Sequence, residues 1–195
     1  MFEGSVKCKL KRSAGVQNGK KSEGLQKKTH QPRSTPPWVR RARNDRHYNT
    51  NMSQRHFIQN DSTMLITTVT LNRIPFFLNQ AYAREAIECL YRVQGFHPFF
   101  LYGFVIMPDH IHILMKVPSP KKVSTVIGSY KSGLTFDLGI KKLWQERFHI
   151  RFPKNPSEAL RYIHLNPVRK GICECPESYP WSSASGKWDV SALDV

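Results

Sequence analysis

The sequence is short of acidic residues. It contains 14 Asp and Glu residues against 30 Lys and Arg residues, which gives a net charge of +16 over 195 residues. So large a deficit of negative charge indicates a polyanionic partner, such as DNA, RNA or an anionic membrane surface.

Cysteines are few and long apolar runs are missing. The cysteines are Cys8, Cys89, Cys173 and Cys175. Only the last two are close in sequence, and a single C-x-C is a weak signal for a metal or redox site, so we expect free thiols in a reducing compartment. No stretch approaches the roughly 20 apolar residues that span a bilayer, and the N-terminus lacks the apolar segment of a secretory signal. We therefore expect a soluble cytoplasmic protein without a membrane partner.

The positive charge is concentrated in the first third of the chain. Residues 1–60 hold 14 Lys and Arg against 3 Asp and Glu, a net charge of +11, and residues 61–195 carry the remaining +5. The first segment is also poor in apolar residues, which predicts a basic, disordered tail. Such a tail fits nonspecific phosphate contacts. Two alternatives stay open, namely that the tail has no function and that translation starts at Met52.

Regular elements are expected from Thr63 onward. Strands are predicted over residues 63–71, 98–106, 110–117 and 143–152, and helices over residues 79–94, 124–139 and 156–166. This order predicts an α+β fold, a ferredoxin-like antiparallel sheet with helices packed on one face. We assign residues 61–187 to this domain and residues 188–195 to a C-terminal tail. Alternation in the last strand would turn Phe148, Ile150 and Phe152 inward, and its exposed side would then carry Arg147, His149 and Arg151.

Two histidines define the most informative strand. His110 and His112 share one face because alternate side chains of a strand point the same way, and the opposite face is wholly apolar. Both imidazoles are then in reach of one metal ion or one phosphate. The plainer alternative is a pair of packed or solvated histidines, so the prediction of a site needs a further group.

The last predicted helix offers such groups. Tyr162 and Asn166 are four residues apart and lie on one helical face, one turn apart. If this helix packs against the histidine strand, His110, His112 and Asn166 form a neutral N/O ligand set that suits Mg²⁺ or Mn²⁺. The cation would polarise a phosphoryl oxygen, and Tyr162 would attack the phosphorus to give a covalent phosphotyrosine. Alternatively, Tyr162 is a core or interface aromatic residue.

Three segments carry a family resemblance. Residues 102–114 read Tyr-Gly-Phe-Val-Ile-Met-Pro-Asp-His-Ile-His-Ile-Leu, residues 161–171 read Arg-Tyr-Ile-His-Leu-Asn-Pro-Val-Arg-Lys-Gly, and residues 179–183 read Tyr-Pro-Trp-Ser-Ser. The first resembles the histidine-hydrophobe-histidine (HUH) motif of single-tyrosine, IS200-like transposases. The other two resemble the REP-associated tyrosine transposase branch of that family.

The resemblance implies a metal-dependent transposase that cleaves and rejoins single-stranded, hairpin-containing DNA. It implies that His110 and His112 bind the metal, that Tyr162 forms a 5′-phosphotyrosine, and that no nucleotide cofactor is needed. Asn166 replaces the glutamine of the insertion-sequence relatives as the third ligand. The expected partner is DNA in the nucleoid, and both a monomer and a homodimer remain open. Candidate phosphate contacts are Lys131, Arg147, Arg151 and Arg169.

Two other functions remain open at this stage. One is a catalytically silent nucleic-acid-binding module on the same scaffold, because stacking and phosphate contacts require no chemistry. The other is a metal-dependent nuclease in which water attacks and Tyr162 only packs.

Overall fold

The computed structural model describes residues 61–193 of the chain. The predictions for residues 1–60, including the basic tail and the alternative start at Met52, lie outside the described residues. Within the described range no helix is both long and apolar enough to cross a membrane.

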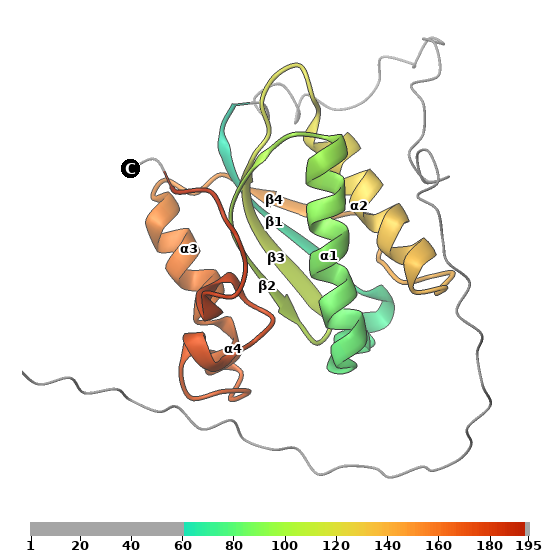
Figure 1. Cartoon of the computed structure of the whole chain (residues 1–195), viewed down its shortest axis with the longest axis vertical. Helices are drawn as coiled ribbons and strands as arrows, with labels where there is room; N and C mark the ends of the chain where they lie inside the picture. Colours follow the sequence, from blue (N-terminus) through green and yellow to red (C-terminus); the bar gives the residue numbers. More distant parts are fainter. Residues whose placement is uncertain (1–60, 194–195) are drawn as a thin grey trace, which may run out of the picture.

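An antiparallel sheet of four strands forms the centre of the fold (Figure 1). The strands are β1 (Thr63–Val69), β2 (Phe100–Met107), β3 (His110–Lys116) and β4 (His149–Arg151), in the spatial order β2-β3-β1-β4. The β2–β3 hairpin turns at Pro108 and Asp109, as the sequence predicts. The histidine strand β3 is therefore central, with a neighbour on each side.

Two long helices, α1 (Gln80–Phe96) and α2 (Val123–Asp137), cover one face of the sheet (Figure 1). The side chain of Asn79 caps α1 by accepting a hydrogen bond from the Ala81 amide at 3.0 Å. The apolar face of β3 enters this core, where Ile111, Ile113 and Met115 are fully buried. This core supplies most of the apolar burial of the described chain, and it packs against the face of β3 opposite the histidines.

The opposite face of the sheet is covered by α3 (Pro156–His164) and α4 (Asn166–Arg169) (Figure 1). These short helices enclose a second, smaller apolar cluster with the sheet. Its buried members are Leu65, Tyr102, Val105, Met107, Leu114, Ala159, Ile163, Cys173 and Tyr179. The predicted α+β fold with an antiparallel sheet is confirmed, but the expectation that helices pack on one face only is wrong. Helices α3 and α4 cover the face that carries the histidines, because that face also has apolar residues to bury.

Gly103 allows α3 to approach the sheet closely. It sits at a bulge in the β2–β3 pairing. A Cβ atom there would lie 2.3 Å from Leu160 Cδ1 and 3.1 Å from Ser183 Oγ. Ser183 Oγ accepts from the Phe104 amide at 3.0 Å and lies 2.8 Å from His164 Nε2, which ties α3 to β2.

The last strand is shorter than predicted. Pairing with β1 is limited to His149–Arg151, preceded by an isolated bridge between Thr70 and Trp144. An edge strand forms hydrogen bonds with one neighbour only, and its pairing can end before its alternating sequence pattern does. The prediction that Phe152 faces inward is wrong, because the ladder ends at Arg151 and the Phe152 side chain is 46% exposed.

The last predicted helix is divided in two. Pro167 has no amide hydrogen to donate to the carbonyl of Ile163, so α3 ends at His164 and α4 begins at Asn166. Proline is tolerated in the first turn of α4, where its amide would have had no partner.

Candidate functional site

The two histidines of β3 lie side by side on the face covered by α3. The ring centroids of His110 and His112 are 4.8 Å apart, and the rings are nearly perpendicular. In the sheet, His112 pairs with Thr67 and His110 pairs with Val69 on β1. The structure confirms that the two imidazoles share one face, as strand alternation predicts.

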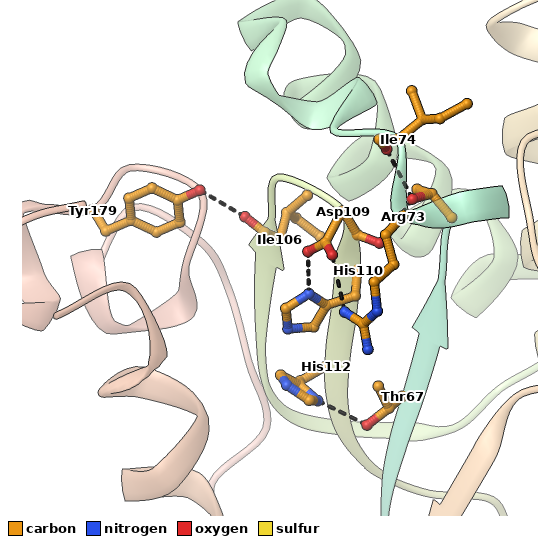
Figure 2. Close-up of polar contacts among 9 residues, drawn as sticks. Thr67, Arg73, Ile74, Ile106, Asp109, His110, His112 and Tyr179 are labelled. Atoms are coloured by element: carbon orange, nitrogen blue, oxygen red, sulfur yellow. Dashed lines mark hydrogen bonds and ion pairs between the residues drawn. The ribbon is translucent and has the colours of Figure 1, made fainter. Parts of the chain in front are cut away.

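The Nδ1 atom of each histidine already has a partner (Figure 2). Asp109 Oδ1 lies 2.5 Å from Nδ1 of His110, and a carboxylate can only accept, so that nitrogen carries the hydrogen. Thr67 Oγ1 lies 2.8 Å from Nδ1 of His112. When the hydroxyl accepts, each neutral ring keeps its Nε2 lone pair for a ligand, which is the usual arrangement behind metal-binding histidines.

Asp109 is itself held in place by Arg73, whose guanidinium lies 3.0 Å from Oδ2 (Figure 2). Burial alone would raise the pKa of Asp109, but hydrogen bonds from His110 and Arg73 outweigh it and leave the pKa below its ordinary value. Arg73 and its neighbour Asn72 have φ values of 54° and 53°. Left-handed backbone at two consecutive non-glycine residues is uncommon, and here it accompanies the contact with Asp109.

Burial keeps His112 uncharged. Its residue is 8% exposed. Desolvation by burial is the main cause that lowers the pKa of His112 to about 4, and the electrostatic interaction with the neighbouring His110 acts in the same direction. At neutral pH the ring is therefore a neutral nitrogen donor, the protonation state that a metal ligand requires.

Tyr162 faces the histidines from α3 of the same chain. Its ring centroid lies 6.1 Å from that of His112, and the side chain remains 39% exposed. The Arg169 guanidinium carbon lies 5.1 Å from the Tyr162 ring centroid, within cation–π range. The helix that carries Tyr162 therefore packs against the histidine strand of the same chain, which is the arrangement that the predicted site requires.

Asn166 holds the end of the tyrosine helix. Its side-chain nitrogen donates to the carbonyl oxygens of Tyr162 at 3.1 Å and Ile163 at 3.4 Å, which replaces a bond that Pro167 cannot make. Two carbonyl acceptors also fix which amide atom is nitrogen. The amide oxygen is the remaining polar atom of the side chain, and its role as a metal ligand stays a prediction.

The donor set fits a hard or borderline divalent cation. His110 and His112 offer two nitrogen lone pairs, Asn166 an amide oxygen, and a bound phosphate would add further oxygens. No group of three His, Cys, Asp or Glu side chains within residues 61–193 is placed to hold a metal ion. Cys89 and Cys173 are buried free thiols.

Two of the four predicted phosphate contacts lie beside Tyr162. Arg169 stacks on its ring, and Arg151 lines a cleft whose wall includes Tyr162. Arg147 is exposed on the segment before β4. Lys131 instead links α2 to the chain before β4, donating to the carbonyl oxygens of Gln145 at 2.5 Å and Glu146 at 3.0 Å.

Sequence reasoning did not assign roles to Thr67, Arg73 and Asp109. The role of Asp109 could have been predicted from the sequence, because it directly precedes His110 and carboxylates often orient metal-binding histidines. Thr67 and Arg73 required the β1–β3 register, which the sequence does not provide.

The chain is similar to known proteins over most of its described residues. Residues 59–164 match the family model described as "Transposase IS200 like". The chain is 29% identical over 134 residues to the REP-associated tyrosine transposase of Escherichia coli, covering 67% of this chain and 80% of that protein. It is 32% identical over 135 residues to a Haemophilus influenzae protein assigned to the same group, covering 60% and 76% respectively.

A solved structure has the same fold. The structure of a REP-associated tyrosine transposase bound to a REP hairpin superposes with a TM-score of 0.62 at 23% identity. The match covers 74% of this chain and 94% of that one.

The fold and the family match together define the class, and the chain belongs to the IS200-like transposase family. Within this family it is of the REP-associated tyrosine transposase type, in agreement with the motifs in its sequence.

Proposed function

We propose that this chain is a metal-dependent DNA strand transferase that cleaves and rejoins single-stranded, hairpin-containing DNA through Tyr162. The observation that carries the proposal is the placement of the Tyr162 ring 6.1 Å from His112, beside two histidines whose Nδ1 atoms are already engaged. A nucleic-acid-binding module would have no need for two oriented imidazoles beside the tyrosine, because stacking and phosphate contacts require no chemistry.

Cleavage exchanges one phosphodiester for another. The Tyr162 oxygen loses its proton to solvent and attacks the scissile phosphorus, so an O–P bond forms to the tyrosine. The bond from phosphorus to the 3′ oxygen breaks, and that oxygen leaves and takes up a proton. The products are a 5′-phosphotyrosine and a free 3′-OH, and attack by a 3′-OH on the phosphotyrosine reverses the exchange.

The protein's residues hold the reacting groups in place. A divalent cation bound by His110 and His112, with Asn166 as the proposed third ligand, would supply Lewis-acid polarisation of a phosphoryl oxygen. Asp109 and Thr67 fix the two imidazole rings, and Asn166 fixes the end of the helix that carries Tyr162. Such positioning accounts for a large share of the catalysis in phosphoryl transfer.

The DNA partner is inferred from three features. The described domain and its N-terminal segment are both net basic, Arg151 and Arg169 adjoin Tyr162, and the related solved structure contains a REP hairpin. We propose single-stranded DNA with a hairpin as the substrate, and action at the nucleoid. Because His112 and Tyr162 meet within one chain, a monomer contains both parts of the site.

Covalent capture tests the proposal. The protein is incubated with Mg²⁺ or Mn²⁺ and a library of end-labelled single-stranded oligonucleotides, each with a hairpin flanked by randomised arms. We expect denaturant-resistant protein–DNA adducts with the wild type and none with Tyr162→Phe or His112→Ala. Cleavage without adduct, equal in wild type and Tyr162→Phe, would indicate a nuclease that uses water. Binding without cleavage would indicate a binding module.

A further inference from the structure

A cleft opens beside Tyr162 on the side toward the start of α3. Its volume is about 570 Å³, within the range of ~300–1,000 Å³ found for small-molecule sites. The lining residues are Arg151, Phe152, Pro153, Lys154, Asn155, Glu158, Ala159 and Tyr162. We name it the tyrosine cleft.

We propose that the tyrosine cleft binds the deoxynucleotide that directly flanks the scissile phosphate, with its base stacked on Phe152. The inference rests on the proposed function, because the wall of the cleft contains the nucleophile. Tyr162 is part of the lining of the cleft, so a nucleotide that adjoins the reacting phosphate is within reach of it.

The aromatic wall supports a base rather than a phosphate alone. Phe152 is 46% exposed although it follows a strand of alternating pattern whose preceding apolar residues, Phe148 and Ile150, pack against the main core. A large exposed aromatic side chain in the lining of the cleft suits stacking, since every base presents a π face.

Charge supports a nucleotide as well. Arg151 and Lys154 are exposed, and neither forms an ion pair with a residue in the described part of the chain. Both are free to contact phosphate oxygens on either side of the base. Glu158 lies one turn before Tyr162 on the same helix face and adds one carboxylate to the lining. A mixed lining of two cations and one anion matches a nucleotide, which carries both phosphate and base donors, better than a bare anion.

The side chain of Asn155, at the N-terminus of α3, offers a further polar contact for a nucleotide in the cleft. Asn155 caps the helix with its side-chain oxygen, which accepts from the Glu158 amide at 3.2 Å. Its side-chain nitrogen therefore remains available as a donor toward the cleft.

The test is a thermodynamic cycle on binding, which does not require cleavage. The tightest-binding oligonucleotide of the hairpin library is labelled, and its dissociation constant is measured by fluorescence anisotropy for wild type and Phe152→Leu. Each protein is measured against the intact strand and against a series of strands with one abasic site at successive positions of the two arms. Adduct mapping identifies which of these positions flank the scissile phosphate and which lie four or more nucleotides away. Phe136→Leu, at a phenylalanine on α2 that is even more exposed than Phe152, at 61%, is the matched control.

We expect Phe152→Leu to weaken binding of the intact strand about tenfold, as for a lost base–aromatic stack. An abasic site at one of the two flanking positions should weaken binding by a similar factor and make the Phe152 substitution silent. Arg151→Gln and Lys154→Gln should each lower the slope of log K against log salt by about one. Phe136→Leu should bind as the wild type.

Other results would overturn the inference. These are equal binding by Phe152→Leu and Phe136→Leu, effects of Phe152→Leu and the flanking abasic sites that simply multiply, coupling to the distant abasic site only, or no binding by any strand. Failure of the proposed function is a separate result, namely the absence of adducts from strands that the wild type binds.

Discussion

The hydroxyl oxygen of Thr67 lies 2.8 Å from Nδ1 of His112, directly across the β1–β3 pair. Thr67 therefore governs which nitrogen of His112 is available to a ligand. Its neighbour Thr68 points to the other face, is fully buried, and makes no hydrogen bond through Oγ1 within the described chain. The two residues form a natural pair for experiment.

Thr67→Val should lower the affinity for Mn²⁺ about tenfold or more, because loss of a group that orients a metal-binding histidine typically costs 10–100-fold. The measurement is calorimetric titration of the purified protein with Mn²⁺. Thr68→Val is the matched control and should leave the affinity unchanged. Equal affinities for all three proteins would show that Thr67 does not orient a ligand.

Thr68→Val should also stabilise the protein, by about 1 kcal/mol, because it removes a buried hydroxyl without a hydrogen-bond partner and preserves the shape of the side chain. Urea unfolding monitored by circular dichroism gives the free energy of unfolding. A loss of stability would mean that the hydroxyl has a partner in solution.

The ion pair between Arg73 and Asp109 predicts that substitutions at these two residues lower the Mn²⁺ affinity to different degrees. Asp109→Asn should weaken Mn²⁺ binding roughly 10–100-fold, since the carboxylate that orients His110 loses its charge. Arg73→Gln should have a smaller effect, about threefold or less, because the Arg73 side chain is 65% exposed and exposed ion pairs contribute little. Asp137→Asn, which removes a carboxylate paired with Arg92 on the opposite face of the sheet, should not change metal affinity. An Arg73 effect larger than that of Asp109 would contradict this order.

The lowered pKa of His112 makes stability depend on pH. The ordinary value is 6.5 and the folded value is about 4. Above pH 6.5 the His112 ring is neutral in both the folded and the unfolded chain, so the contribution of His112 to the free energy of unfolding is fully present. As the pH falls from 6.5 toward 4 the unfolded chain takes up a proton that the folded chain does not, so up to about 3 kcal/mol is lost.

The measurement is urea unfolding between pH 4 and pH 8 without metal. Lowered pKa values of His97 and His164 act in the same direction, so the comparison with His112→Gln isolates the contribution of His112. We expect the pH dependence to be shallower in the variant. Parallel curves for the two proteins would show that His112 titrates normally in the folded state.

Asn166→Asp separates the two roles of Asn166. The aspartate keeps an oxygen ligand but cannot donate to the carbonyls of Tyr162 and Ile163. Stability should fall by about 1–3 kcal/mol, the usual cost of leaving buried polar groups unpaired, and Mn²⁺ affinity should be kept. Asn166→Ala should lose both stability and affinity. If Asn166→Ala keeps full Mn²⁺ affinity, Asn166 acts on the helix end alone.

The sequence predicted the elements well where periodicity and tertiary packing agree. Strand β3 begins at His110 as predicted, and the cap at Asn79 and the start of α3 at Pro156 are also confirmed. These positions depend on local chemistry, namely alternation, capping and the fixed φ of proline. Phe152 was misplaced because alternation cannot show where an edge strand loses its partner.

The residues that gather at the candidate site were predictable from the sequence, and the residues that support them were not. His110, His112, Tyr162 and Asn166 are recognisable by spacing and by motif. Thr67 reaches His112 through a register set by the whole sheet, and Arg73 reaches Asp109 through two left-handed residues. Neither contact has a signature in a local stretch of sequence.

Strand β3 serves both halves of the molecule at once, with Ile111, Ile113 and Met115 in the main core and His110 and His112 in the site. A single-residue insertion or deletion within it would turn every following side chain to the other face. The imidazoles would then lie in the hydrophobic core, and the isoleucines would line the candidate site. Evolution and protein engineers can therefore exchange side chains along this strand, but neither can change its length by one.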